Sequence, residues 1–422
     1  RVPTGARLKG DTLKLEVYIR MNLLKYYKLY PKEIWILTFI SFIFVARKTI
    51  FAVSRQVGDY TATVDSSTSL ALIGLFAGLV AIIYYNSYVK KFKNKVFIYT
   101  AYYIWAICSI LWAGNASIIL FKAVEVLICF YLICLTIYRI NNINKALFYA
   151  ILFSTAVSAT DFLNTIIKLG INALHTNAYT MSAMIALLLS LTCIKLNIFS
   201  FKSLKYIIIL NGIMIIMVAS RRTMIIMGTS GASYISTIIG LLFLLATNKK
   251  GVSIIGVTLF SLILYYIYDA FSEDIIPLLF PGRSIESIES GTGRSKIWEA
   301  CFRSWEQSPI LGKGFIVGER SLGNFGLGHN ALSAHNSFMS VLVNAGLIGI
   351  FFFLFFLIKW FWKVYTLGKK NTYANALFPA MVAAIVNCNS CPALGTDWGY
   401  VASCMYCLIA ISFIYLPRKN YH

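Results

Sequence analysis

The sequence predicts an all-α, polytopic integral membrane protein with about twelve transmembrane helices and one large loop between two of them. Two observations lead to this fold class. Of the 422 residues, 59% are hydrophobic and 13% are charged, and the mean hydropathy is +0.73, which is more apolar surface than a soluble core of this length buries. The apolar residues also recur in runs long enough, or nearly so, to cross a hydrocarbon layer of about 30 Å.

The predicted spans fall into two groups, nine within residues 33–271 and three within residues 337–422. The first, seventh and eleventh are short for a crossing. In chain order the twelve spans are Glu33 to Ala46, Ser69 to Val89, Val96 to Trp112, Ala116 to Tyr138, Ala146 to Ile167, Thr180 to Leu196, Tyr206 to Ala219, Thr223 to Ala246, Val252 to Phe271, Ser337 to Lys359, Ala374 to Val386 and Gly399 to Leu416.

The net charge of +22 comes from cations that are dispersed between the spans, so we expect no nucleic-acid partner. Alternate connections hold most of them, as the positive-inside rule describes for cytoplasmic loops. This bias predicts a bacterial cytoplasmic (inner) membrane protein with both termini inside and the loop at 272–336 facing the periplasm. These connections hold Lys90, Lys91, Lys93, Lys95, Arg139, Lys145, Lys195, Lys202, Lys205, Lys249, Lys250, Lys359, Lys363, Lys369 and Lys370, and the two ends hold Lys25, Lys28, Lys32, Arg418 and Lys419.

Residues 1–32 are expected to form an N-terminal cytoplasmic extension. Arg1 to Arg20 lack the apolar core of a signal peptide, and Met21 precedes a basic segment. We assign no function to this extension.

Cys388-x-x-Cys391 and Cys404-x-x-Cys407 reproduce the spacing of a four-cysteine zinc site. The second pair lies in the middle of an apolar span, where a pair of thiolates would be desolvated. We therefore predict that these cysteines pack as small apolar groups, with a disulfide between Cys388 and Cys391 as the alternative. Neither a metal site nor a cofactor is expected.

Charged residues inside predicted spans are costly and tend to be functional. Lys122 and Glu125 are three residues apart on one helical face, so we expect them to pair. Asp161 belongs either to a substrate path or to a contact with a basic group of another helix. Gly74 and Gly78 have the spacing of small residues that lets helices pack closely.

A large share of the acidic residues and histidines of the chain lies between Phe271 and Gly349. This segment holds seven of the 16 acidic residues and two of the four histidines. We predict that it forms an active-site lid over the outer membrane face, with a mobile glycine-rich loop that has no nucleotide-binding fingerprint. The acidic residues are Glu273, Asp274, Glu286, Glu289, Glu299, Glu306 and Glu319, and the glycines are Gly312, Gly314, Gly318, Gly323, Gly326 and Gly328.

Two adjacent cations, Arg221 and Arg222, stand on a short outer connection, where the positive-inside rule disfavours them. A bound anion would compensate their charge, because guanidinium groups present a planar fork of donors to phosphate. The alternative is that both side chains extend to lipid phosphates. The lid adds Arg283 and Arg294 as further cationic candidates.

The lid is predicted to contain an amphipathic helix from Arg294 to Gln307, which Ser308-Pro309 ends. Arg303 adds a cation to this helix. Two tryptophans are expected to pack at the membrane interface, and four other residues form the inner face of the helix; they are Trp298 and Trp305, and Ile297, Ala300, Cys301 and Ser304.

His335 stands at the mouth of the tenth predicted span, followed by Asn336 and Ser337, either of which can cap the helix. Beside the positive end of a helix an imidazole favours its neutral form, which a general base requires. We predict this role for His335; the alternative is an interfacial histidine that bonds only to its own loop. His329 and Asn336 are secondary candidates.

Four motifs of this region form a recognisable array. They resemble motifs of the O-antigen ligase and O-antigen polymerase superfamily, and the resemblance is most specific over roughly Ser220 to Ile350. The earlier spans match only in number and hydrophobicity. The motifs are Gly293-Arg294-x-x-x-Trp298, Ser308-Pro309-Ile-Leu-Gly312-x-Gly314, Ala334-His335-Asn336-Ser337-Phe338 and Asn344-Ala345-Gly346-Leu347-Ile348-Gly349.

The resemblance implies a metal-independent, inverting glycosyltransferase at the periplasmic face. The implied donor is an undecaprenyl-diphosphate-linked oligosaccharide, and the acceptor is lipid A-core for a ligase or a second lipid-linked glycan for a polymerase. The family's lid arginine corresponds to Arg294, its histidine to His335, and its Ser-Arg pair to Ser220 with Arg221 or Arg222. The arginines would bind the diphosphate, and the histidine would act as the base. Membrane lipids and a chain-length regulator protein are further candidate partners.

Polymerase is preferred over ligase only on its frequency in surface-polysaccharide systems, and teichoic-acid or glycoprotein acceptors are alternatives. The rival class is a transporter or flippase for lipid-linked sugars, whose folds show internal repeats and broken helices at matching positions. No repeat is visible in this sequence. Convergence of Arg294, His335 and Arg221 or Arg222 on one outward cavity would favour transfer, whereas pseudo-twofold halves would favour transport.

Overall fold

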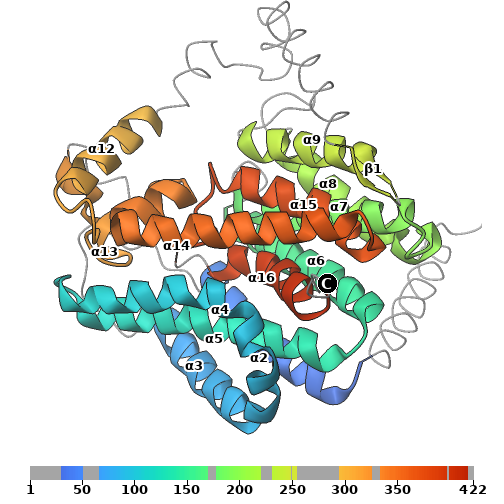
Figure 1. The fold of residues 1–422 in the computed structure, drawn as a ribbon, viewed down its shortest axis with the longest axis horizontal. Helices are drawn as coiled ribbons and strands as arrows, with labels where there is room; N and C mark the ends of the chain where they lie inside the picture. The colour runs from blue at the N-terminus through green and yellow to red at the C-terminus, as the bar shows by residue number, and fades with distance from the viewer. Residues whose placement is uncertain are drawn as a thin grey trace, which may run out of the picture.

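A computed structural model describes residues 30–50, 66–169, 177–219, 231–248, 250–253, 294–325, 333–396 and 399–416. Within these residues, helices occupy eleven of the twelve predicted spans (Figure 1). The ninth, Val252 to Phe271, lies outside the described residues except for its first two. The eleven helices are α2 (Lys32–Thr49), α3 (Ser66–Tyr84), α4 (Asn86–Cys108), α5 (Ala116–Ile140), α6 (Ile143–Leu169), α7 (Asn177–Lys195), α8 (Phe201–Ala219), α9 (Gly231–Ala246), α14 (Ser337–Gly368), α15 (Thr372–Asn387) and α16 (Gly399–Ile414).

The length and composition of these helices are those of an all-α membrane protein. Among the described residues, three helices are long and apolar enough to cross a membrane, Ala116–Ile140, Ile143–Ile167 and Ser337–Gly368, and a bent pair brings the number to four. Shorter apolar helices lie at Thr180–Lys195, Ile235–Ala246, Thr372–Asn387 and Ala402–Ile414. Twelve crossings therefore stay a prediction, as does the orientation.

The bent pair consists of α3 and α4, which meet at Tyr85 with an angle of 98°. The predicted basic connection at Lys90 to Lys95 is therefore wrong, because these residues lie inside α4. The reason is an amphipathic stripe: Val89, Phe92 and Val96 are buried at the spacing of one helical face, while the lysines between them are exposed.

The helices pack most closely where small residues meet. A Cβ added at Gly78 of α3 would lie 2.4 Å from Ile128 of α5, and one at Gly74 would lie 3.2 Å from Ile43 and from Phe44 of α2. The predicted close packing at these two glycines is confirmed. α16 packs against α2, α4, α5, α6, α7, α14 and α15, and it is buried along most of its length.

The predicted pairing of Lys122 with Glu125 is confirmed at 3.5 Å between Nζ and Oε2. Arg47 of α2 adds a second ion pair to Glu125, and all three side chains are buried. Asp161 of α6 is also buried, and its Oδ2 atom has no hydrogen-bond partner among the described residues.

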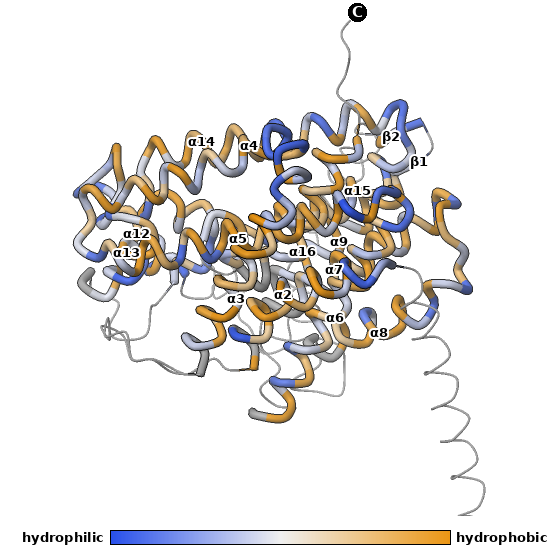
Figure 2. The backbone as a smooth tube through the Cα atoms, turned by 90° about the horizontal axis from the view of Figure 1, so that it is seen from below, coloured by the Kyte–Doolittle hydropathy of each residue, from blue (hydrophilic) through white to orange (hydrophobic). Residues whose placement is uncertain are grey.

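The two ends of α14 lie next to different secondary-structure elements. At its amino end lie two short helices, α12 (Arg294–Glu306) and α13 (Val317–Arg320) (Figure 1). At its carboxyl end a two-residue antiparallel pair, β1 (Thr247–Asn248) and β2 (Gly251–Val252), is the exception to the all-α prediction. Hydrophilic residues gather around this hairpin (Figure 2), where Gly251 approaches the backbone of Lys369.

Candidate active site at the amino end of α14

The structure describes four of the predicted site residues: Arg294, Arg303, His335 and Asn336. The other predicted residues lie outside the described part of the chain; they are Ser220, Arg221, Arg222, Arg283 and His329.

The predicted amphipathic helix of the lid is confirmed as α12, which ends at Glu306. Ala300, Cys301 and Ser304 are buried on its inner face. Its apolar contacts are with Ala334, Val343 of α14 and Leu322 of the 3-10 helix η4 (Ser321–Phe325). α12 is thus held against the residues that lead into α14.

Both tryptophans of α12 bond to backbone carbonyls. The indole N–H of Trp298 donates to the Ala334 oxygen at 3.3 Å, and that of Trp305 donates to the Pro309 oxygen at 2.9 Å. The contact of these two tryptophans with the membrane interface stays a prediction. The Trp298 bond ties α12 to the residue immediately before His335.

His335 adopts a left-handed backbone conformation with φ 49°, which few residues other than glycine occupy. Its backbone N–H donates to Ser333 Oγ at 3.2 Å. His335 is exposed at the surface, but protein atoms near its imidazole desolvate it in part. This desolvation, together with the positive charge of Arg294, lowers the pKa of His335 from its ordinary value. The side chain therefore favours the neutral form.

The charge of Arg294 also reaches the α15–α16 connection. Burial raises the pKa of the Cys391 thiol, and Arg294 acts on it in the opposite direction. This connection supports the start of α14, because Ser337 N–H donates to the Cys388 carbonyl at 2.8 Å and Ser337 Oγ donates to the Cys391 carbonyl at 3.2 Å. The α15–α16 connection, which we call the floor of the candidate site, thus lies near both Arg294 and the residues that follow His335.

Asn336 caps α14. Its side-chain oxygen accepts from the backbone N–H groups of Phe338 at 2.8 Å and Met339 at 3.2 Å. The expectation that Asn336 or Ser337 caps the helix is confirmed for Asn336, and this bonding accounts for its position without a ligand. Arg303 is exposed on α12 and pairs with Glu299 one turn earlier, so it does not join the Arg294 and His335 group.

Sequence reasoning missed Glu319 of α13 as a site residue. Its carboxylate is buried and accepts from Ser340 Oγ at 2.6 Å, from Ala334 N–H at 3.0 Å, from Ser333 Oγ at 3.3 Å and from Asn344 Nδ2 at 3.4 Å. A signal was present in the sequence: Ser337, Ser340 and Asn344 form a polar stripe on an otherwise apolar helix. Such a stripe calls for a buried polar partner.

Two of the glycine-containing motifs bind each other. Lys313 N–H donates to the Val343 carbonyl and Gly314 N–H to the Asn344 carbonyl, both at 2.9 Å, and Leu347 N–H donates to the Pro309 carbonyl at 2.9 Å. This pairing needs the kink at Gly346 in α14, where φ is 64°.

The prediction of a mobile glycine loop is therefore wrong for its first three glycines, Gly312, Gly314 and Gly318, which are buried. A Cβ at Gly312 would lie 2.5 Å from the backbone nitrogen of Ala345. These glycines permit close approach of two backbones, which is a packing role.

The start of α9 lies beside the same floor. Thr180 Oγ1 donates to Ser233 Oγ at 2.9 Å, and Ser233 Oγ donates to Asn387 Oδ1 at 3.3 Å. Asn387 precedes Cys388, the acceptor of the Ser337 N–H bond. Gly231, where the described chain resumes, is two residues before Ser233; Arg221 and Arg222 lie outside the described residues.

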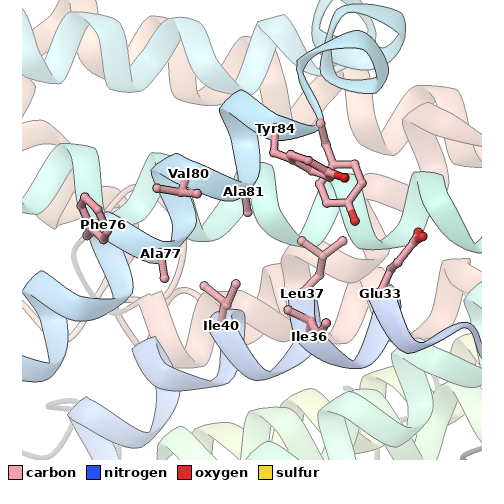
Figure 3. Close-up of a pocket in the computed structure, with 10 residues that line it drawn as sticks. Glu33, Ile36, Leu37, Ile40, Phe76, Ala77, Val80, Ala81 and Tyr84 are labelled. Atoms are coloured by element: carbon pink, nitrogen blue, oxygen red, sulfur yellow. The ribbon is translucent and has the colours of Figure 1, made fainter.

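A cavity of about 390 Å³ lies elsewhere, between α2 and α3 (Figure 3). Its lining is mainly apolar and includes Leu37, Ile40 and Phe76. Glu33 and Tyr84 form its polar end, and Glu33 pairs with Arg139. A carboxylate at the polar end disfavours a diphosphate ligand, so this cavity is not the predicted anion site.

No protein-family model matches the chain, and no curated protein is significantly similar to it. The resemblance to O-antigen ligases and polymerases thus depends on the motifs and their spacing, and the activity it implies is a proposal.

Proposed function

We propose that the protein is a glycan transferase at the outer face of the bacterial cytoplasmic membrane, with an undecaprenyl-diphosphate-linked oligosaccharide as its donor. The observation that carries this proposal is the convergence of Arg294 and His335 at the amino end of α14. A cation suited to phosphate and a neutral imidazole suited to proton removal meet there. Arg221 and Arg222, whose convergence on the same cavity would favour transfer over transport, lie outside the described residues. Apolar helices around Arg294 and His335 supply the setting that a lipid-linked donor requires.

In the proposed reaction, the oxygen of an acceptor hydroxyl attacks the anomeric carbon of the donor while the His335 imidazole takes the hydroxyl proton. The bond between the anomeric carbon and the phosphate oxygen breaks, and its electron pair leaves with undecaprenyl diphosphate. The anomeric configuration inverts. A general base contributes about a hundred- to ten-thousand-fold to such a step.

Arg294 stabilises the negative charge that develops on the leaving diphosphate. A preorganised donor of this kind is worth about 3 to 4 kcal/mol of transition-state stabilisation. Arg221 and Arg222, which lie outside the described residues, are proposed to bind the same diphosphate because the Ser220-Arg221-Arg222 sequence resembles the family's Ser-Arg pair. Which of the two arginines contacts phosphate is left to mutagenesis.

The distribution of cations supports an outward-facing site. α14 runs from Ser337 to Gly368 with a kink at Gly346. His335 precedes its amino end, and Lys369 and Lys370 follow its carboxyl end, next to the hairpin that contains Lys250. Under the positive-inside rule the lysine end is cytoplasmic, which puts Arg294 and His335 at the periplasmic end.

Complementation separates the two acceptors. The chain is expressed in one strain that lacks O-antigen polymerase and in another that lacks O-antigen ligase, and lipopolysaccharide is analysed on gels. A ladder restored in the first strain identifies a polymerase, and long chains moved onto lipid A-core in the second identify a ligase. We prefer the polymerase outcome. Absence of either change, with the protein present in the membrane and with matched donor and acceptor glycans, argues against both activities.

A further inference from the structure

Glu319 contacts the chain on both sides of His335. Before the histidine it accepts from Ser333 Oγ and Ala334 N–H, and after it from Ser340 Oγ in the first turns of α14. All three donors bond to the same carboxylate oxygen, Oε1. The carboxylate therefore fixes the path of the backbone into and out of His335.

A relay connects Glu319 to the histidine backbone itself. Ser333 Oγ accepts from the N–H of His335 at 3.2 Å and donates its own hydrogen to Glu319 at 3.3 Å. His335 has φ 49°, a conformation that persists only where surrounding contacts determine it. The serine and the carboxylate supply those contacts.

α13, which carries Glu319, is itself held to α14. The N–H of Glu319 donates to Asn344 Oδ1 at 3.0 Å, and Asn344 Nδ2 donates back to the carboxylate at 3.4 Å. A Cβ added at the preceding Gly318 would lie 2.7 Å from the Val343 carbonyl oxygen, so only glycine permits this approach. The carboxylate thus stands on a fixed support.

We propose that Glu319 is a positioning residue, which holds His335 in the left-handed conformation that presents its imidazole beside Arg294. This inference rests on the proposed function for its catalytic meaning, but the geometry it describes can be measured separately. Glu319 acts on His335 through Ser333 and Ala334, and it is not proposed to contact the substrate.

A carboxylate suits this task better than an amide. It only accepts hydrogen bonds, through two oxygens, and its neighbours Ser333, Ala334, Ser340 and Asn344 each direct a donor at it. Glutamine would turn an NH₂ donor toward one of those donors. A buried charge is tolerated where several donors satisfy it.

The test is the titration of the His335 imidazole, followed by NMR in the full-length chain with ¹³C-labelled histidine, in lipid nanodiscs. The H335N variant identifies the signal. Variants E319A and S333A should loosen the turn and move the imidazole from Arg294 and from the protein atoms near it, so that the pKa of His335 rises toward its ordinary value. If Glu319 acted only through its charge, its removal would lower that pKa instead.

Glu306→Gln is the matched control, because this exposed carboxylate lies at the end of α12. It should leave the titration of His335 unchanged. An unchanged or lowered pKa in both E319A and S333A overturns the inference. Should E319A fail to accumulate in the membrane, S333A alone decides, since it breaks the relay and retains the carboxylate.

Activity then links positioning to chemistry. In the complementation assay S333A and E319A should each reduce polymer formation by at least about tenfold, and E306Q should not. If the titration moves in the two variants while polymer formation stays at the wild-type level, positioning of His335 does not serve transfer and the inference fails. If H335A is itself fully active, the proposed function fails, and the titration still decides whether Glu319 positions His335.

Discussion

Desolvation and the charge of Arg294 on α12 together lower the pKa of His335, the residue before the cap of α14. The motif that contains Arg294 and the motif that contains His335, at opposite ends of the lid, therefore lie near each other. Trp298, one turn after Arg294, fixes their relation through its bond to the Ala334 carbonyl. This electrostatic effect of Arg294 on His335, together with the roles proposed for the two side chains, underlies the predictions that follow.

Removal of the Arg294 charge should raise the pKa of His335, because a nearby cation disfavours the protonated imidazole. The R294Q variant tests this by NMR titration, and R294K, which retains the charge, should keep the pKa lowered. Lys296→Gln removes a charge from an exposed position of the same helix and serves as the control. A pKa that is the same in R294Q and in the wild type would mean that desolvation alone perturbs His335.

The transfer rate should depend on the neutral form of His335. The rate is expected to rise with pH through the pKa of His335 and to level off above it, since a base must be unprotonated. Because that pKa is lowered, the fall in rate should occur on the acid side of the ordinary imidazole range. Initial rates measured between about pH 5 and 8 should show this limb, and R294Q should move it to higher pH. If R294Q does not shift this acid limb of the rate profile, the limb belongs to a group other than His335.

The kink in α14 should tolerate only glycine. In G346A a Cβ would lie 2.3 Å from the Ile310 carbonyl oxygen, and φ is 64°, a conformation that costs about 1 to 3 kcal/mol for other residues. We expect a lower Tm in detergent, or no accumulation. Gly212 of α8 has open space around its Cβ position, so G212A should be neutral or stabilising by about 0.5 to 1 kcal/mol. Equal effects of the two variants would argue against the kink.

Asn336 should act as a helix cap. N336A is expected to cost about 1 kcal/mol of stability, and N336D and N336S should retain most of it, because both side chains accept from the first N–H groups of the helix. Thermal unfolding measures this difference. If N336A keeps the wild-type Tm and yet abolishes polymer formation, Asn336 contacts substrate and the cap is not its main role.

Much of the fold follows from apolar periodicity. The start of α14 at Ser337, its cap at Asn336 or Ser337, the inner face of α12 and the pairing of Lys122 with Glu125 were all predictable, since each depends on residues close together in sequence. Local patterns decide such features.

Features that depend on contacts between distant segments were not predictable. The lysines from Lys90 to Lys95 predict a connection between spans. Phe92 packs against Tyr131 and Tyr138 of α5, and this packing keeps the segment helical. The glycine-rich sequence around Gly312 predicts a mobile loop, because nothing in this segment shows that α14 packs against it. Glu319 escaped notice because its four donors come from two later segments.

The most direct test of the central claim is the initial rate of glycan transfer by purified protein in proteoliposomes, with a lipid-linked oligosaccharide as donor. H335Q and R294A should each lower the rate by about a hundredfold or more, with a wild-type Tm. The double variant should be little slower than the slower single variant, because groups that act as a unit are not additive. A wild-type rate in either single variant would contradict the account.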